Sequence, residues 1–147
     1  MKRAEAIPLP GFAYVPGQTA RHDPAVFEVF HDSIRDGMTL EEIECSLAWQ
    51  AGWRFIEAGF HWEAHEVLEP VWMALPDGGR EKQFVQAVIQ LANAELKARM
   101  GKPNAVRRLC DMAEGLLEAA GLESLMGVTQ GWVKARLETL RLTQPRT

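Results

Sequence analysis

One short segment of the chain combines residue types that can carry out chemistry. The run His65-Glu66-Val67-Leu68-Glu69 places an imidazole and two carboxylates within about one turn of a helix. Trp62 and Trp72 flank this run at helical spacing. Imidazoles and carboxylates can exchange protons with a bound molecule, bind a metal ion or pair with one another at the edge of a core. The segment therefore predicts a polar site bordered by two indoles.

A metal site is one hypothesis for this segment. His61 and His65 stand four residues apart, a spacing that lets two imidazoles bind one zinc ion, and Glu69 follows four residues later. Eight helical residues span about 12 Å, so His61 and Glu69 do not easily share an ion. His65 can pair with Glu69, or with Glu66 and a group from elsewhere. The segment is one residue from the H-E-x-x-H pattern of metalloproteases, with a glutamate as the second ligand. No cofactor is expected.

Two further hypotheses need no metal. The carboxylates can form a paired polar network that fixes helix register, with Arg21 or Arg54 as the cation, and Glu63 is expected to point toward solvent. Alternatively, His65 is an acid–base group oriented by a carboxylate beside a bound ligand. No serine or cysteine neighbours this histidine in sequence, so the second hypothesis lacks a nucleophile.

A second helix carries an unusual stripe of uncharged amides. Its sequence is apolar over most of the circumference, but Gln86, Gln90 and Asn93 recur at steps of four and three. Amides donate and accept hydrogen bonds in fixed geometry, which suits an interior network. We expect this stripe to face the histidine–glutamate segment across a shared crevice. The predicted crevice comprises Trp62, His65, Glu66, Glu69, Trp72, Gln86, Gln90 and Asn93.

The elements that position these residues are predicted to be all α-helical. Residues 1–22 contain three prolines and two glycines among apolar residues, which predicts an extended arm packed on the body. Residues 23–147 are predicted to form a single compact bundle of about five to six antiparallel helices. No strand is expected.

Capping residues give the expected helix boundaries. Asp23-Pro24 begins a helix that Gly37 ends, and a capping box at Thr39 begins one that runs to Gly59. A third helix covers residues 60–75 and is expected to bend at Pro70, which removes the hydrogen bond to the Glu66 carbonyl. The remaining helices are expected over residues 80–100, 103–121 and 129–142.

The run Glu63-Ala64-His65-Glu66-Val67-Leu68-Glu69-Pro70-Val71-Trp72, followed by Phe84-Val85-Gln86-Ala87-Val88-Ile89-Gln90-Leu91-Ala92, resembles a known family. It is similar to the small helical proteins of the domain of unknown function 309 family, whose motif is E-A-H-E-x-L-E-x-x-W followed by a helix with a G-x-I-Q-x-A-like run. The match covers about residues 55 to 120, with further similarity in residues 14–17 and 21–22. Ala87-Val88 replaces the small glycine-like position, and His61 is not part of the motif. The resemblance implies an all-helical fold and supplies no reaction.

Composition excludes several classes of protein. The chain has 147 residues, 47% of them hydrophobic and 24% charged, which is ordinary for one globular domain. The net charge of −4 argues against a general nucleic-acid binder, and no apolar run is long enough for a membrane helix. The first residues do not resemble a secretory signal, and Cys45 and Cys110 lack metal-type spacing, so a cytoplasmic protein with reduced thiols is expected.

These observations leave two functional hypotheses. The first is a protein that binds a small molecule or a protein partner in the polar crevice without catalysis, with a homodimer as a possible assembly. The alternative is a metal-assisted or acid–base hydrolase that uses His65, Glu66 and Glu69. Whether the protein is an enzyme is left open by the sequence.

Overall fold

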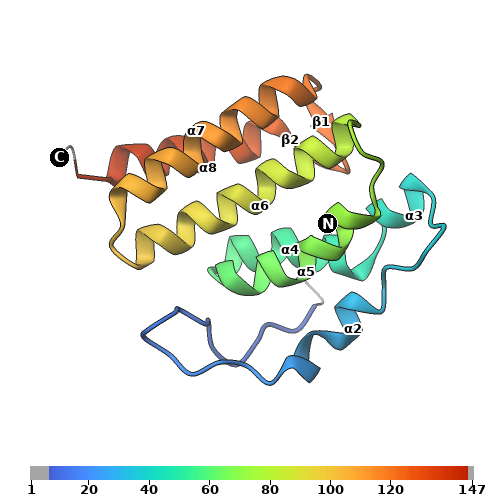
Figure 1. Cartoon of the computed structure of the whole chain (residues 1–147), viewed down its shortest axis with the longest axis horizontal. Helices are drawn as coiled ribbons and strands as arrows, with labels where there is room; N and C mark the ends of the chain where they lie inside the picture. Colours follow the sequence, from blue (N-terminus) through green and yellow to red (C-terminus); the bar gives the residue numbers. More distant parts are fainter. Residues whose placement is uncertain (1–6, 146–147) are drawn as a thin grey trace. The chain divides into compact units, whose positions relative to one another are not determined.

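The computed structural model of the protein describes residues 7–145, so the first six residues of the predicted arm lie outside the described part. The chain divides into two compact units, residues 1–75 and residues 76–147. Figure 1 shows that helices make up most of both units, which confirms the all-α prediction. The division falls at Pro76, in the loop that follows the third predicted helix.

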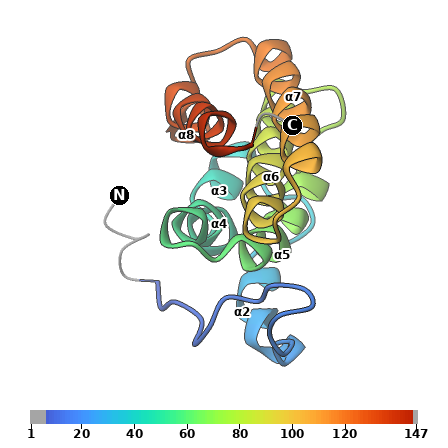
Figure 2. The same ribbon diagram turned by 90° about the vertical axis from the view of Figure 1, so that its left-hand side faces the viewer.

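The first unit begins with the arm and continues through short helices into a helical hairpin. Its elements are the 3-10 helix η1 (Pro24–Phe27), α2 (Glu28–His31), α3 (Leu40–Glu44), α4 (Leu47–Ala58) and α5 (His61–Ala74). Figures 1 and 2 show α4 and α5 side by side. The predicted caps hold in detail: the Asp23 side chain accepts the Ala25 N–H, and both hydrogen bonds of the Thr39 capping box are present.

Two of the predicted helices are shorter than expected, in each case because a serine side chain caps the backbone. The first ends at His31 instead of reaching Gly37. There the Ser33 hydroxyl donates to the Phe30 carbonyl and accepts the Ala48 N–H, which ties the end of α2 to the start of α4. The predicted helix from Thr39 to Gly59 is two helices, since Ser46 is extended and its side chain accepts the Trp49 N–H.

The hairpin of α4 and α5 is closely packed. A Cβ added at Gly52 on α4 would lie 2.2 Å from Leu68 Cδ2 on α5, so the glycine lets the leucine approach the α4 backbone. Gly59, with a φ of 89°, ends α4 in the left-handed conformation, and α5 begins two residues later. The buried face of α5 includes an apolar arc of four residues, Ala64, Val67, Leu68 and Val71.

The second unit is an antiparallel arrangement of three helices with a small hairpin. Its elements are α6 (Arg80–Arg99), α7 (Pro103–Ala120), β1 (Ser124–Leu125), β2 (Val128–Thr129) and α8 (Gln130–Thr143). Within this unit α6 contacts both α7 and α8, as Figure 2 shows nearly end-on. The apolar residues around α6 are accordingly buried, among them Phe84, Val85, Val88 and Leu91.

The hairpin contradicts the expectation that the chain contains no strand. Leu125 pairs with Val128, and the two residues between them, Met126 and Gly127, have φ values of 57° and 76°. Positive φ at both central positions is the geometry of a two-residue hairpin turn. Each strand has two residues, too few for an alternating pattern, so the sequence periodicity could not indicate it.

None of the helices described over residues 7–145 has both the length and the apolar character that a membrane crossing requires.

Candidate functional site

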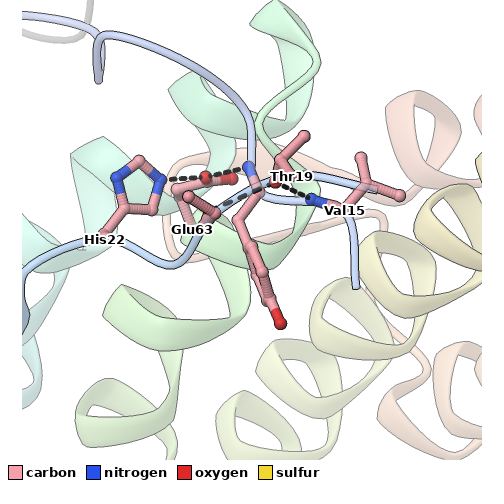
Figure 3. Close-up of polar contacts among 6 residues, drawn as sticks. Val15, Thr19, His22 and Glu63 are labelled. Carbon is pink, nitrogen blue, oxygen red and sulfur yellow. Dashed lines mark hydrogen bonds and ion pairs between the residues drawn. The ribbon is translucent and has the colours of Figure 1, made fainter. Parts of the chain in front are cut away.

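Glu63 is the most deeply buried carboxylate among the described residues of the first unit, which corrects the prediction that it points toward solvent. Its exposed fraction is 0%. One carboxylate oxygen, Oε2, accepts the backbone N–H of Tyr14 at 2.7 Å and lies 2.6 Å from Nε2 of His22 (Figure 3). The other oxygen, Oε1, is buried and has no hydrogen-bond partner within residues 7–145. The pattern of residues along α5 alone puts Glu63 on the solvent side of the helix. That pattern contains no information about the arm, which supplies both donors.

A tight turn in the arm brings these two donors to one oxygen. Gln18 N–H donates to the Val15 carbonyl at 2.9 Å, and Pro16 and Gly17 occupy the two central positions of the turn. Proline fixes its own φ, and Gly17 supplies the positive φ of 79° that a type II turn needs at its second central position. The Thr19 hydroxyl accepts the Val15 N–H at 3.0 Å and closes the loop (Figure 3).

The contact with Glu63 determines the hydrogen positions on His22. A carboxylate accepts hydrogen bonds and does not donate them, so Nε2 of His22 carries the hydrogen. In the neutral ring Nδ1 is then an acceptor. Figure 3 shows this second ring nitrogen on the side away from Glu63, and it has no hydrogen-bond partner in the described part of the chain. The side chain of His22 is only 4% exposed.

Aromatic rings hold the His22 imidazole in place. Phe12 stacks on it with ring centroids 4.3 Å apart and an interplanar angle of 16°, and Trp62 lies parallel at 6.0 Å with an angle of 22°. Phe27 meets the imidazole edge-on at 5.4 Å. The ring is therefore fixed by its neighbours as well as by its hydrogen bond.

A second histidine supplies the hydrogen-bond donor that Pro70 cannot provide in α5. Proline has no N–H, so the carbonyl of Glu66, four residues earlier, loses its helical partner. Nε2 of His31, at the end of α2, lies 3.0 Å from this carbonyl oxygen. Since a carbonyl only accepts, His31 donates from Nε2, and its Nδ1 is an acceptor in the neutral ring. The predicted loss of the hydrogen bond thus draws α2 onto α5.

The arm, η1, α2 and α5 surround a pocket of about 730 Å³. This volume is in the range of small-molecule sites. Its walls combine aromatic rings with titratable side chains: Tyr14, Pro16, Arg21, His22, Pro24, Phe27, Glu28, His31, Trp62 and Glu66. Two residues of the predicted crevice, Trp62 and Glu66, are therefore part of one pocket.

Sequence reasoning missed the residues that the arm and α2 contribute. His22 had a usable signal, because it is the last residue of the arm and belongs to the short stretch, residues 21–22, where the sequence also resembles the family. His31 had a weaker one: a carbonyl freed by Pro70 needs a donor, and a histidine on a neighbouring helix can supply it. Neither signal indicates which surface of α5 the arm covers.

Other residues of α5 lie outside this pocket. His65 Nε2 and Glu69 Oε2 form an i,i+4 pair at 3.4 Å, with side chains 36% and 56% exposed. Trp72 is half-buried and His61 is buried. Within residues 7–145, no group of three or more histidine, cysteine, aspartate or glutamate side chains is arranged to hold a metal ion. The metal hypothesis for His61, His65 and Glu69 stays a prediction.

The amide stripe belongs to α6 of the second unit. Gln86, Gln90 and Asn93 are each half-buried, and Asn93 Nδ2 donates to Gln90 Oε1 at 3.1 Å. This hydrogen bond links two of the three amides along α6. The crevice that we expect this stripe to share with α5 stays a prediction.

Comparison with known proteins identifies a family for the central part of the chain. Residues 49–109 match the model of the family described as "Domain of unknown function (DUF309)", which confirms the resemblance seen in the sequence. The match begins in α4, includes all of α5 and α6 and ends in α7. The arm residues that reach Glu63 precede it. No curated protein and no solved structure matches the chain.

Proposed function

We propose that the first unit binds a small organic ligand in the pocket between the arm, α2 and α5, without transforming it. The observation that supports this most directly is the position of His22. Its side chain is almost completely buried, it lines the pocket, and its Nδ1 has no hydrogen-bond partner in the described residues. In the neutral ring this atom accepts hydrogen bonds, so a ligand group that donates one can pair with it.

The construction of the pocket also supports ligand binding. Glu63, the Phe12 and Trp62 rings and the arm turn hold His22 in one orientation before any ligand arrives. A preorganised site loses less conformational entropy on binding than a flexible one. The surrounding rings of Tyr14 and Phe27 provide apolar contact area beside the polar groups, a combination typical of small-molecule sites.

The hydrolase alternative has less support. It requires His65, Glu66 and Glu69 to act together, but only Glu66 lines the pocket. His65 pairs instead with Glu69 on a face where both side chains are partly exposed. Catalysis by these three residues stays a prediction that any measured hydrolysis lost on His65→Ala would support.

A set of three small probes tests the proposal. Benzyl alcohol, benzylamine and benzoate share one ring and differ in charge. In titrations of ¹⁵N-labelled protein, at least one probe should give saturable amide shifts around Tyr14, Trp62 and Glu66 in the millimolar range expected for so few atoms. Trp62→Ala should abolish these shifts, whereas Trp132→Ala, on α8 of the second unit, should leave them unchanged. If none of the three probes gives saturable shifts in the pocket, the proposal is wrong.

A further inference from the structure

We infer that the pocket selects an organic cation, such as a primary ammonium attached to a flat apolar group, over anions of the same shape. This inference rests on the proposed function and specifies the class of its ligand. It follows from the balance between donors and acceptors among the residues that line the pocket.

The formal charge of the lining is negative. Glu28 and Glu66 contribute two negative charges and Arg21 one positive charge, which leaves −1 with the histidines counted as neutral. Neither glutamate has an ion-pair partner within residues 7–145. A carboxylate in a partly enclosed pocket without a cation attracts a positively charged ligand more strongly than one in open water.

The histidines strengthen the preference for a cation, because each already donates its Nε2 hydrogen to a group of the protein. His22 uses its Nε2–H for Glu63, and His31 uses its Nε2–H for the Glu66 carbonyl. In the neutral rings both Nδ1 atoms are left as acceptors. A ligand that donates hydrogen bonds, as an ammonium does with three N–H groups, matches these acceptors; a carboxylate ligand does not.

Two further features of the pocket also favour a cationic ligand. Glu63 stands directly behind His22, and its buried Oε1 has no partner within the described residues, so part of its negative charge is not compensated by donors. The faces of aromatic rings also attract cations, and Trp62, Tyr14 and Phe27 all line the pocket. Among the lining residues Arg21 favours an anion; Arg21 and Glu28 are both exposed, whereas Glu66 is half-buried, so Glu66 carries most of the preference.

The same three probes test this inference separately from ligand binding itself. Benzylamine should bind at least about tenfold more tightly than benzoate, with benzyl alcohol between them, because one unit of charge near a carboxylate is worth more than this ratio requires. Binding of benzoate or benzyl alcohol in preference to benzylamine would overturn the inference and leave the proposed function intact. Absence of binding by all three would overturn both.

Charge variants provide the control for structural effects. Glu28→Gln and Glu66→Gln should each weaken benzylamine about fivefold or more and leave benzyl alcohol unchanged, since the alcohol does not depend on the charge. In the double variant the lining charge becomes +1, and the preference should reverse toward benzoate. Arg21→Gln should not weaken benzylamine. Equal losses for the amine and the alcohol in the glutamate variants would show a merely structural role and contradict the inference.

Discussion

The two units differ in how their carboxylates are paired with cations. In the second unit, Arg136 makes a two-pronged contact with Glu95, at 3.0 and 3.2 Å, and Arg141 bridges Asp111 and Glu114. In the first unit, Glu63 is buried against a neutral backbone N–H and an imidazole, and the carboxylates of the pocket are without ion pairs in the described residues. Charges that neutralise one another stabilise a fold. Charges left without partners around a pocket are available to a ligand, and the ligand site that we propose lies in the first unit for this reason.

The largest expected difference between the units is the loss of stability when the most buried carboxylate described in each, Glu63 or Glu95, is replaced by an amide. Glu63→Gln should lower the free energy of unfolding by about 3 kcal/mol, because two buried donors lose an ionised acceptor. Glu95→Gln should cost about 1 kcal/mol, since Arg136 is 30% exposed and can be solvated. Urea unfolding followed by circular dichroism measures both. A cost for Glu63→Gln no larger than that for Glu95→Gln would break the comparison.

Two glycines test the packing of the units. Gly52→Ala should destabilise the protein by about 1–3 kcal/mol, because the new methyl group would overlap Leu68 in the hairpin of α4 and α5. Gly115→Ala, in the interior of α7, should stabilise it by about 0.5–1 kcal/mol, since no atom lies within 4 Å of the added Cβ. Thermal unfolding of the two variants against the parent gives both signs. A Gly52→Ala variant that is as stable as the parent, or more stable, would show that the close approach in the first unit is not needed.

The two thiols should differ in reactivity between the units. Cys45, in the first unit, is exposed, whereas Cys110, in the second, is buried, and burial raises the pKa of its thiol above the ordinary value of 9.0. A smaller thiolate fraction and restricted access both slow its reaction. A thiol-reactive chromophore should therefore titrate one cysteine of the native protein rapidly and the second only in denaturant. Rapid reaction of Cys110 in the native protein would contradict its place in the core.

The smallest effect concerns an exposed carboxylate of the first unit. The Thr39 backbone N–H, and then its hydroxyl, lower the pKa of Glu42 below its ordinary value of 4.5. Because the folded pKa lies below the unfolded one, the stabilisation is present at neutral pH and is lost as the pH falls through the folded pKa. The stability difference between the parent and Glu42→Gln should therefore be constant near neutrality and shrink in acid. Glu41→Gln, on the same helix, is the control; an unchanged difference at low pH would contradict the capping box.

Local signals in the sequence predicted most helix ends and the polar character of α5. Gly59, Pro103 and Thr129 stand where helices end or begin, because capping depends on a few neighbouring residues. The burial of Glu63 could not be predicted in this way. It depends on an arm about 40 residues earlier in the chain, and the two contacts to Glu63 span 49 and 41 residues.

The pocket was predictable in part for the same reason. Trp62 and Glu66 lie on α5, the helix that carries the histidine–glutamate segment, so their types and spacing indicated a site. His22 comes from the arm and His31 from the first predicted helix, and only the fold brings them to α5. The hydrogen bond that Pro70 removes was predictable from the sequence, but its replacement by His31 was not.

The tautomer of His22 is the most direct test of this account, because the acceptor-rich pocket depends on it. Long-range ¹H–¹⁵N spectra of the intact protein, recorded at a pH at which the imidazole is neutral, should show hydrogen on Nε2 of His22 and none on Nδ1. Glu63→Gln should disturb this signal, whereas Glu95→Gln should not. A His22 ring with hydrogen on Nδ1, or one that averages between both tautomers, would contradict both the role of Glu63 and the preference for a cationic ligand.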